Sequence, residues 1–260
     1  MLPLEGFLVL TRDAVWVVKG VDACEEVIAY PRYDLRGRKL PRELKEALVE
    51  ERKGPSDCAP VPVPRLSPRE GELLDPRWLL DSDPKAKEFA SLFPCEAGLT
   101  GSRALGNEGG DIDLVFYDHS CFEDVVEVLR ELKAKGLLRE VEGKWDGLGP
   151  RARLLRKKYS VLEGVWEGTP FSIRLVLGPR APRRPVAVGW VRVRGRVVRS
   201  DPFTPTTIVL DDGTVVESLR LQHSEVPIGY EVEVRGLLEV RTDGVRVSLP
   251  PGGKLEILAT

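Results

Sequence analysis

Two aspartates at the start of a short apolar run constrain this chain more than any other feature. Asp111 and Asp113 stand one residue apart, and residues 114–117 (Leu-Val-Phe-Tyr) form a run typical of a buried strand. Alternate residues of a strand point to the same face, so the two carboxylates are expected side by side. Neighbouring carboxylates raise each other's pKa unless a cation lies between them. The pair therefore predicts a divalent-cation site.

A small turn, Gly101-Ser102, comes before the aspartates, separated from them by residues 103–110. Glycine lets the backbone approach a polyphosphate closely, and the Ser102 hydroxyl adds a hydrogen-bonding group. Ligands that are all oxygen favour Mg²⁺ or Mn²⁺. The ordered combination with a following strand is more specific than either part. The alternative interpretations are a solvated Gly/Asp loop ahead of a buried strand and a structural calcium loop.

This order of residues resembles the signature of the polymerase-beta-like nucleotidyltransferase superfamily, and Arg103-Ala104 resembles its minimal members. The resemblance implies that an acceptor hydroxyl attacks the α-phosphate of a nucleoside triphosphate and that pyrophosphate leaves. It also implies that Asp111 and Asp113 are catalytic residues that hold Mg²⁺ or Mn²⁺. The nucleotide-binding residues that it suggests are Gly101, Ser102, Arg103 and Arg174.

The sequence departs from the family at the third carboxylate, which a neighbouring strand usually supplies. The strand expected at residues 171–177 offers Ser172 and Arg174 instead. Glu163, on the partner strand of the expected hairpin, is the nearest substitute and is predicted to complete the catalytic set. A cation such as Arg174 beside a metal would weaken metal binding unless a phosphate lay between them. Three outcomes stay open: Glu163 completes the site, the enzyme uses one metal, or the core only binds nucleotide.

The composition describes a folded, charge-rich chain that has room for two or three small domains. It has 260 residues, a formal net charge of −2 and 31% charged residues, so nothing global demands a polyanionic partner. One asparagine, one glutamine and one methionine beside 21 prolines are typical of a thermophile. No leader pattern and no apolar run of about 18 residues are evident, so we expect a cytoplasmic protein without membrane partners.

Changes in sequence pattern divide the chain into four segments and predict an α+β fold. Residues 1–53 are expected to form a small N-terminal β-module with a short helix, and the proline-rich residues 54–75 a connector. Residues 76–185 contain the motif and are expected to form a nucleotidyltransferase-like mixed α/β core. Residues 186–260 show five short alternating strands and resemble an OB-like β-barrel.

Two basic segments are candidates for binding anions. Residues 151–185 hold nine arginines and lysines against two acids, and we interpret them as an anion-binding cluster with a solvated basic face as the alternative. Residues 31–39 could hold phosphates and stack a base through Arg32, Tyr33, Arg36, Arg38 and Lys39, although a solvated turn is favoured there. The barrel segment is nearly neutral, with nine basic and ten acidic residues, which favours a structural or protein-docking role.

The four cysteines are scattered, with no Cys-x-x-Cys pair, and the two histidines complete no conventional zinc spacing. We interpret the cysteines as small buried hydrophobes, with a disulfide as the alternative. The order of segments is also similar to an archaeal family of predicted nucleotidyltransferases. The predicted function is metal-dependent transfer of a nucleoside monophosphate from a nucleoside triphosphate to an RNA or protein acceptor. The alternative is an inactive nucleotide- or nucleic-acid-binding adaptor.

Overall fold

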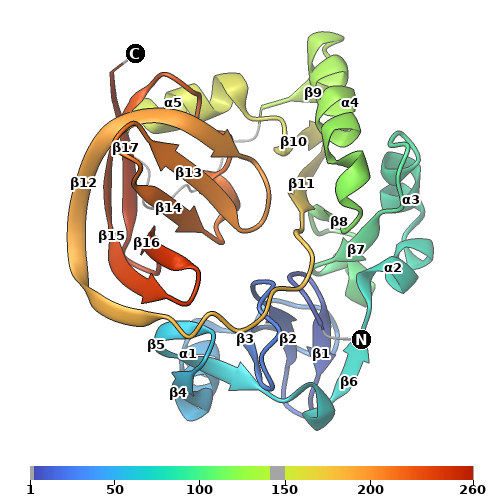
Figure 1. Cartoon of the computed structure of the whole chain (residues 1–260). Helices are drawn as coiled ribbons and strands as arrows, with labels where there is room; N and C mark the ends of the chain where they lie inside the picture. Colours follow the sequence, from blue (N-terminus) through green and yellow to red (C-terminus); the bar gives the residue numbers. More distant parts are fainter. Residues whose placement is uncertain (1–2, 141–149, 260) are drawn as a thin grey trace.

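The computed structural model describes residues 3–140 and 150–259. The chain has an α+β fold in three parts, which Figure 1 shows around a common centre: an N-terminal sheet, a core sheet with helices, and a C-terminal barrel. The α+β class and the C-terminal barrel are thus confirmed. Within the described ranges, no helix combines the length and apolar character that crossing a membrane requires.

The N-terminal sheet has six strands in the order β4-β5-β3-β2-β1-β6. Helix α1 (Arg42–Arg52) and the 3-10 turn η1 (Pro68–Glu70) connect some of them. The strands are β1 (Leu8–Leu10), β2 (Val15–Val18), β3 (Val27–Tyr33), β4 (Lys53–Ser56), β5 (Ala59–Leu66) and β6 (Glu72–Leu74).

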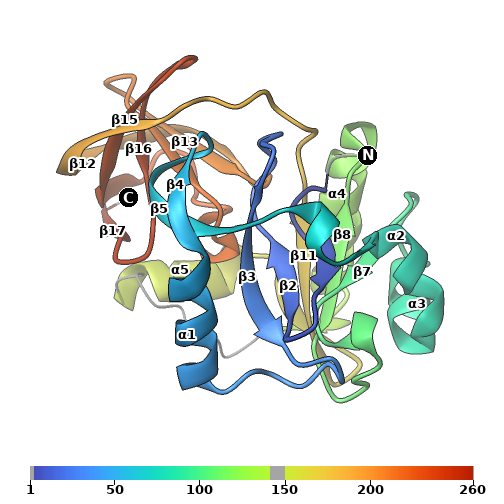
Figure 2. The same ribbon diagram turned by 90° about the horizontal axis from the view of Figure 1, so that it is seen from below.

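Residues 54–75, predicted to be an irregular connector, contribute strands to this sheet instead. The prolines of β5 alternate, at positions 60, 62 and 64, so all the missing N–H groups lie along one edge of the strand. β5 pairs with β3 only through Arg65 and Leu66, beyond the last proline. The pairing of β5 with β3 therefore requires no N–H donor at the three proline positions. Figure 2 shows the β4–β5 hairpin between α1 and the barrel.

The core sheet has the strand order β7-β8-β11-β10-β9, in which β8 and β11 are parallel. One face packs against α3 and α4, and Figure 1 shows these helices on the side away from the barrel. The strands are β7 (Gly98–Thr100), β8 (Ile112–Phe116), β9 (Leu138–Arg139), β10 (Glu163–Trp166) and β11 (Thr169–Leu175). The helical segments are α2 (Pro76–Leu79), η2 (Leu80–Ser82), α3 (Pro84–Ala90), η3 (Arg103–Leu105), η4 (His119–Cys121) and α4 (Phe122–Ala134).

Local sequence signals explain two of these helices. Asp83 caps α3, because its side chain accepts a hydrogen bond from the Ala86 N–H, and Pro84 takes the first helical position. The amphipathic sequence of α4 gives it a buried apolar face, which includes Val125 and Leu129. Ser120 would suit the N-cap of α4, but η4 precedes α4 and Asp118 caps η4.

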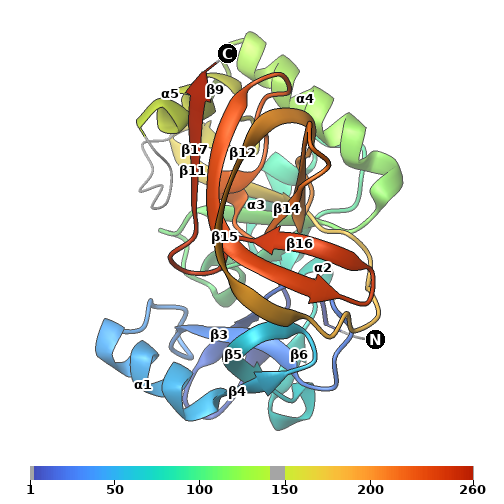
Figure 3. The ribbon, with the colours of Figure 1, turned by 60° about the vertical axis from the view of Figure 1, so that its left-hand side comes forward.

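The C-terminal barrel closes through the strand order β12-β13-β14-β16-β15, since β15 also pairs with β12. β14 and β16 are parallel, and β17 adds to the outer side of β15. Figure 3 shows β12 and β15 running long and curved around the barrel. The elements are β12 (Val186–Asp201), β13 (Thr206–Leu210), β14 (Val215–Ser218), η5 (Leu221–His223), β15 (Glu231–Arg241), β16 (Gly244–Ser248) and β17 (Lys254–Ala259).

The basic segment after residue 150 begins with a helix, α5 (Pro150–Tyr159). Ala152 belongs to the apolar core of the barrel, and Leu155 packs against it. α5 therefore packs with the barrel, although the sequence assigned residues 76–185 to the core. Figure 1 shows it beside β17.

All four cysteines are paired, so their interpretation as unpaired hydrophobes is wrong and the disulfide alternative holds. Cys24 joins Cys58, which ties the β2–β3 loop to the β4–β5 turn. Cys95 joins Cys121, which ties the segment before β7 to η4.

Candidate functional site

The Gly-Ser turn lies directly against the second aspartate. Thr100, at the end of β7, pairs with Asp113 of β8, and the chain then turns at Gly101, whose φ is +76°. A Cβ atom at Gly101 would lie within 3.0 Å of Asp113 Oδ2, so only glycine fits. The motif therefore folds so that its backbone touches its own carboxylate.

Asp111 and Asp113 are close enough for their charges to interact. Asp111 is exposed just before β8, while Asp113 is half-buried within it. Burial raises the pKa of Asp113, and the charge of Asp111 raises it further, against the hydrogen bond from Ser172. The charge of Asp111 thus acts on Asp113 in the direction that the sequence predicted. Asp113 lines the cavity described below, and Asp111 does not.

A polar row crosses the core sheet on the face opposite its helices. Ser172 of β11 lies beside Asp113 of β8, and Glu163 of β10 lies beside Ser172. Ser172 Oγ donates a hydrogen bond to Asp113 Oδ1 at 2.5 Å. Two strand spacings separate Glu163 from Asp113, which places their Cα atoms roughly 9–10 Å apart. The structure thus brings Glu163 to the same face as Asp113, with a serine between them.

This polar row faces a cavity of about 580 Å³ at the junction of the three parts. The core contributes Asp113 and Glu163 to its lining, the N-terminal sheet contributes Tyr30 and Arg32, and the barrel contributes Arg220. Figures 1 and 3 show the three parts facing one another around this junction. No single part could form the cavity alone.

Arg174 lies next to this row and is held by two contacts. Its Nη1 donates to the Leu219 carbonyl at 3.1 Å, and its Nε lies 3.6 Å from Glu5 Oε1. Its charge lowers the pKa of Asp113. Arg174 therefore lines the cavity, as the nucleotide-binding prediction requires, with part of its charge offset by Glu5.

Sequence reasoning missed Glu5 and Lys19, which form an ion pair at the cavity wall in which Glu5 is buried and Lys19 half-buried. Lys19 Nζ lies 2.6 Å from Glu5 Oε1, and the Gly20 N–H donates to Glu5 Oε2 at 2.8 Å. Burial would raise the pKa of Glu5, but the charges of Lys19 and Arg174 hold it below its ordinary value. No local pattern could have identified this cluster, because Glu5 and Lys19 are 14 residues apart in the sequence and Arg174 lies in the core.

Arg103, predicted to bind nucleotide, supports the motif loop instead. Its Nε and Nη2 donate to the two carboxylate oxygens of Asp83 at 2.8 and 3.1 Å. Its Nη1 donates to the carbonyls of Gly110 and Glu108. The side chain is buried and does not line the cavity, so we leave Arg103 out of the nucleotide-binding set.

Ser102 is also buried and away from the cavity lining, whereas Gly101 reaches the lining. The Ser102 carbonyl accepts hydrogen bonds from the N–H groups of Leu105 and Asn107, each at 3.1 Å. Ser102 thus shapes the loop from within, and its hydroxyl stays a predicted nucleotide contact.

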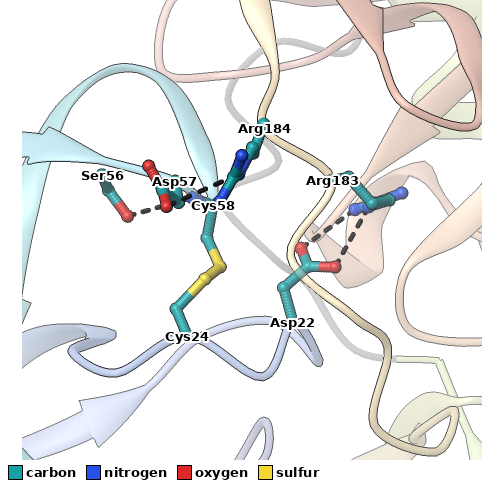
Figure 4. The surroundings of a disulfide bond; sticks show 7 residues. All are labelled: Asp22, Cys24, Ser56, Asp57, Cys58, Arg183 and Arg184. Carbon is teal, nitrogen blue, oxygen red and sulfur yellow. Dashed lines mark hydrogen bonds and ion pairs between the residues drawn. A yellow bond between two sulfur atoms is a disulfide. The ribbon is translucent and has the colours of Figure 1, made fainter.

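The linker from the core to the barrel is fastened close to a disulfide. Figure 4 shows Cys24 bonded to Cys58, with Arg183 beside Asp22 and Arg184 beside Asp57. Arg183 donates to both oxygens of Asp22 at 3.0 Å, and it also contacts Glu217 of β14. This network joins the N-terminal sheet to the barrel at the cavity wall.

The donor set for a metal in the described ranges is small. No group of three or more histidine, cysteine, aspartate or glutamate side chains there is arranged to hold a metal ion. Asp111 and Asp113 alone offer a pair of neighbouring carboxylates in the motif. Their mutual repulsion is what a divalent cation would relieve.

Comparisons with known proteins add little to this geometry. No family model matches the chain, and no curated protein matches it. The chain is similar to a solved chain of the S. pombe Stn1–Ten1 complex, with 16% identity and a TM-score of 0.24. The match covers 45% of this chain and 79% of that chain.

Proposed function

We propose that the cavity binds a nucleoside triphosphate and that the protein transfers its nucleoside monophosphate to a hydroxyl on an RNA or protein acceptor. The row of Asp113, Ser172 and Glu163 beside the Gly101 turn is the observation that supports this best. It combines a close backbone approach with carboxylates on one face of a sheet. The cavity, at about 580 Å³, has the size of a small-molecule site.

In the proposed reaction, the acceptor oxygen forms a bond to the α-phosphorus. The bond from the α-phosphorus to the oxygen that bridges to the β-phosphate breaks, and pyrophosphate leaves with the electron pair. The acceptor proton passes to a carboxylate, and Glu163 is the candidate base because it lines the cavity. Positioning and electrostatics carry such transfers, so no covalent nucleophile is needed.

The chain's own groups would bind the phosphates in this reaction. N–H groups of the turn at Gly101 would contact phosphate oxygens, and Arg174 would offset the charge that develops on the leaving group. Asp111 and Asp113 would hold Mg²⁺ or Mn²⁺, and their all-oxygen donors suit these ions. When bound, the ion would supply positive charge at the phosphate oxygens.

A nucleotide- or nucleic-acid-binding adaptor is the second candidate, and Ser172 favours it. Ser172 occupies the place between Asp113 and Glu163 where the resemblance implies a third carboxylate. Its hydroxyl already bonds to Asp113, which leaves Glu163 on a more distant strand. An adaptor would keep the cavity and its ligand without the transfer.

Label transfer distinguishes the two candidates. The protein is incubated with a nucleoside triphosphate labelled at the α-phosphate, Mg²⁺ or Mn²⁺, and RNA or protein acceptors. We expect acceptor labelling that Asp113→Asn abolishes and Glu163→Gln reduces. Asp124→Asn, on the exposed side of α4, is the matched control and should transfer label normally. Salt-sensitive RNA binding without label transfer, unchanged in Asp113→Asn, would support the adaptor.

A further inference from the structure

The cations that line the cavity fall into two groups. Lys19, Arg174, Arg183 and Arg241 each lie within 4.0 Å of a carboxylate. Arg32 and Arg220 also line the cavity, and neither has a carboxylate at that distance among the described residues. Paired cations neutralise the protein's own acids, whereas Arg32 and Arg220 keep their charge for another anion.

Arg32 owes its position to a β-bulge. Val15 pairs with Tyr33, but the next residue, Trp16, pairs with Pro31, so Arg32 is the extra residue of β3. A bulge redirects the side chains around it and is common beside functional sites. Here Arg32 is exposed at the cavity while its neighbour Tyr33 is buried.

Tyr33 connects Arg32 to the aspartate pair. Burial raises the pKa of Tyr33, and the negative charges of Asp113 and Asp111 raise it further. A hydrogen bond with the side chain of Arg32 acts in the opposite direction. Arg32 therefore contacts a hydroxyl that is within electrostatic reach of both aspartates.

The turn after β3 fixes this end of the strand on the motif loop. A Cβ atom at Gly37 would lie 3.2 Å from the Ser102 carbonyl oxygen, and the Asn107 side-chain amide donates to the Gly37 carbonyl at 3.5 Å. The N-terminal sheet and the motif loop therefore touch directly. This contact holds Arg32 in place relative to Gly101 and Asp113.

Arg220 approaches from the barrel. It follows β14, and its N–H donates to Ser218 Oγ at 3.1 Å. The adjacent Leu219 carbonyl accepts from Arg174 of the core, which fixes this segment against β11. The charge of Arg220 lowers the pKa of Tyr30, which burial raises, so Arg220 faces the same strand, β3, that carries Arg32.

We propose that Arg32 and Arg220 hold the phosphate chain of the nucleoside triphosphate from the N-terminal and barrel walls of the cavity. This inference depends on the proposed function, because it concerns the ligand of the same site. It makes the two β-rich parts components of the nucleotide site and predicts that recognition depends on the phosphates more than on the base. Charge-assisted hydrogen bonds of this kind are worth about tenfold or more in Kd.

Calorimetric titration of the full chain with a nucleoside triphosphate in Mg²⁺ tests the inference. We expect Arg32→Gln and Arg220→Gln each to raise Kd about tenfold or more, and to change binding of the unphosphorylated nucleoside little. Arg12→Gln in the turn between β1 and β2 and Arg192→Gln on the barrel surface are matched controls at exposed sites. Arg220→Lys, which keeps the charge, should recover part of the affinity.

Two results would overturn the inference, and they have different consequences for the proposed function. If the wild type binds the triphosphate and both Gln variants bind it equally well, Arg32 and Arg220 are not phosphate ligands, and the proposed function stands. If the folded wild type binds no nucleoside triphosphate with any base, both the proposed function and this inference fail. Thermal unfolding of each variant shows whether a loss of binding comes from misfolding.

Discussion

Gly101 packs against Asp113 so closely that a side chain at position 101 would lie within 3.0 Å of the carboxylate oxygen Oδ2. The φ of Gly101, +76°, adds a conformational reason for glycine. The two residues stand at the end of one strand and within the next, in direct register through Thr100. Both the close approach to Asp113 and the positive φ therefore require glycine at position 101.

Gly101→Ala should remove label transfer and destabilise the protein, because Asp113 must move. Gly106→Ala is the matched control: its φ is +83°, but a Cβ there would have no atom within 4 Å. Backbone strain alone costs about 1–2 kcal/mol, so the control should lose that much stability and keep its activity. Denaturant unfolding and label transfer of both variants measure the difference. Equal losses of activity would show that proximity to Asp113 is unimportant.

Asp113 should make the metal-free protein less stable as pH rises. Its pKa in the folded state is raised by burial and by Asp111, so the fold favours the protonated form. Stability therefore falls as the pH rises from 3.8, the ordinary carboxyl pKa, through the higher pKa of the folded state. Asp113→Asn should therefore be more stable than the wild type at pH 7 in chelator, and not at pH 3. Urea unfolding at both pH values checks this, and a less stable variant at pH 7 would contradict it.

The motif geometry could be predicted because it is local. Asp113 lies within β8 and the Gly101 turn follows β7 directly, so local spacing accounts for both, whereas Asp111 stands just before β8. The barrel was predictable for a similar reason, since alternating residues and turn signals recur along it. The prediction of an irregular connector at residues 54–75 was wrong, because proline also fits a strand edge where no N–H donor is needed.

The rest of the site depends on contacts between distant segments. Arg103 has the spacing of a phosphate ligand, but Asp83, 20 residues away, binds its guanidinium. Glu5 pairs with Lys19 within the N-terminal part, and it meets Arg174 only when that part docks on the core. Cysteine spacing likewise does not determine which cysteines pair. These positions are set by tertiary packing, which periodicity does not describe.

Glu217 should make stability depend on pH in the opposite direction to Asp113. Burial opposes its ionisation, but hydrogen bonds and charges from Arg183 and Arg241 lower its pKa from 4.5 to about 2. Because the folded pKa lies below the ordinary value, ionised Glu217 stabilises the fold at pH values above 4.5. This stability is lost as the pH falls from 4.5 towards 2. Glu217→Gln should cost about 3 kcal/mol at pH 7 and much less near pH 2. Unfolding titrations across this range test it, and a cost that does not vary with pH would contradict it.

The Cys24–Cys58 disulfide should affect nucleotide binding as well as stability, whereas Cys95–Cys121 should affect stability alone. The two bonds close loops of similar length, with separations of 34 and 26 residues, so each should contribute roughly 3–4 kcal/mol. Only the first lies at the cavity, where Cys58 is part of the lining. Asp22 and Asp57, close to its two cysteines, hold Arg183 and Arg184 of the linker to the barrel (Figure 4).

Paired serine substitutions separate these effects. Cys24→Ser with Cys58→Ser should loosen the wall that carries the β4–β5 hairpin and raise Kd for the triphosphate. Cys95→Ser with Cys121→Ser should lower the free energy of unfolding by a similar amount and leave Kd unchanged. Both are measured well below the melting temperature, so that each variant is folded when it is titrated. If both double variants weaken binding equally, the effect comes from general destabilisation, and the first disulfide has no particular role in shaping the cavity.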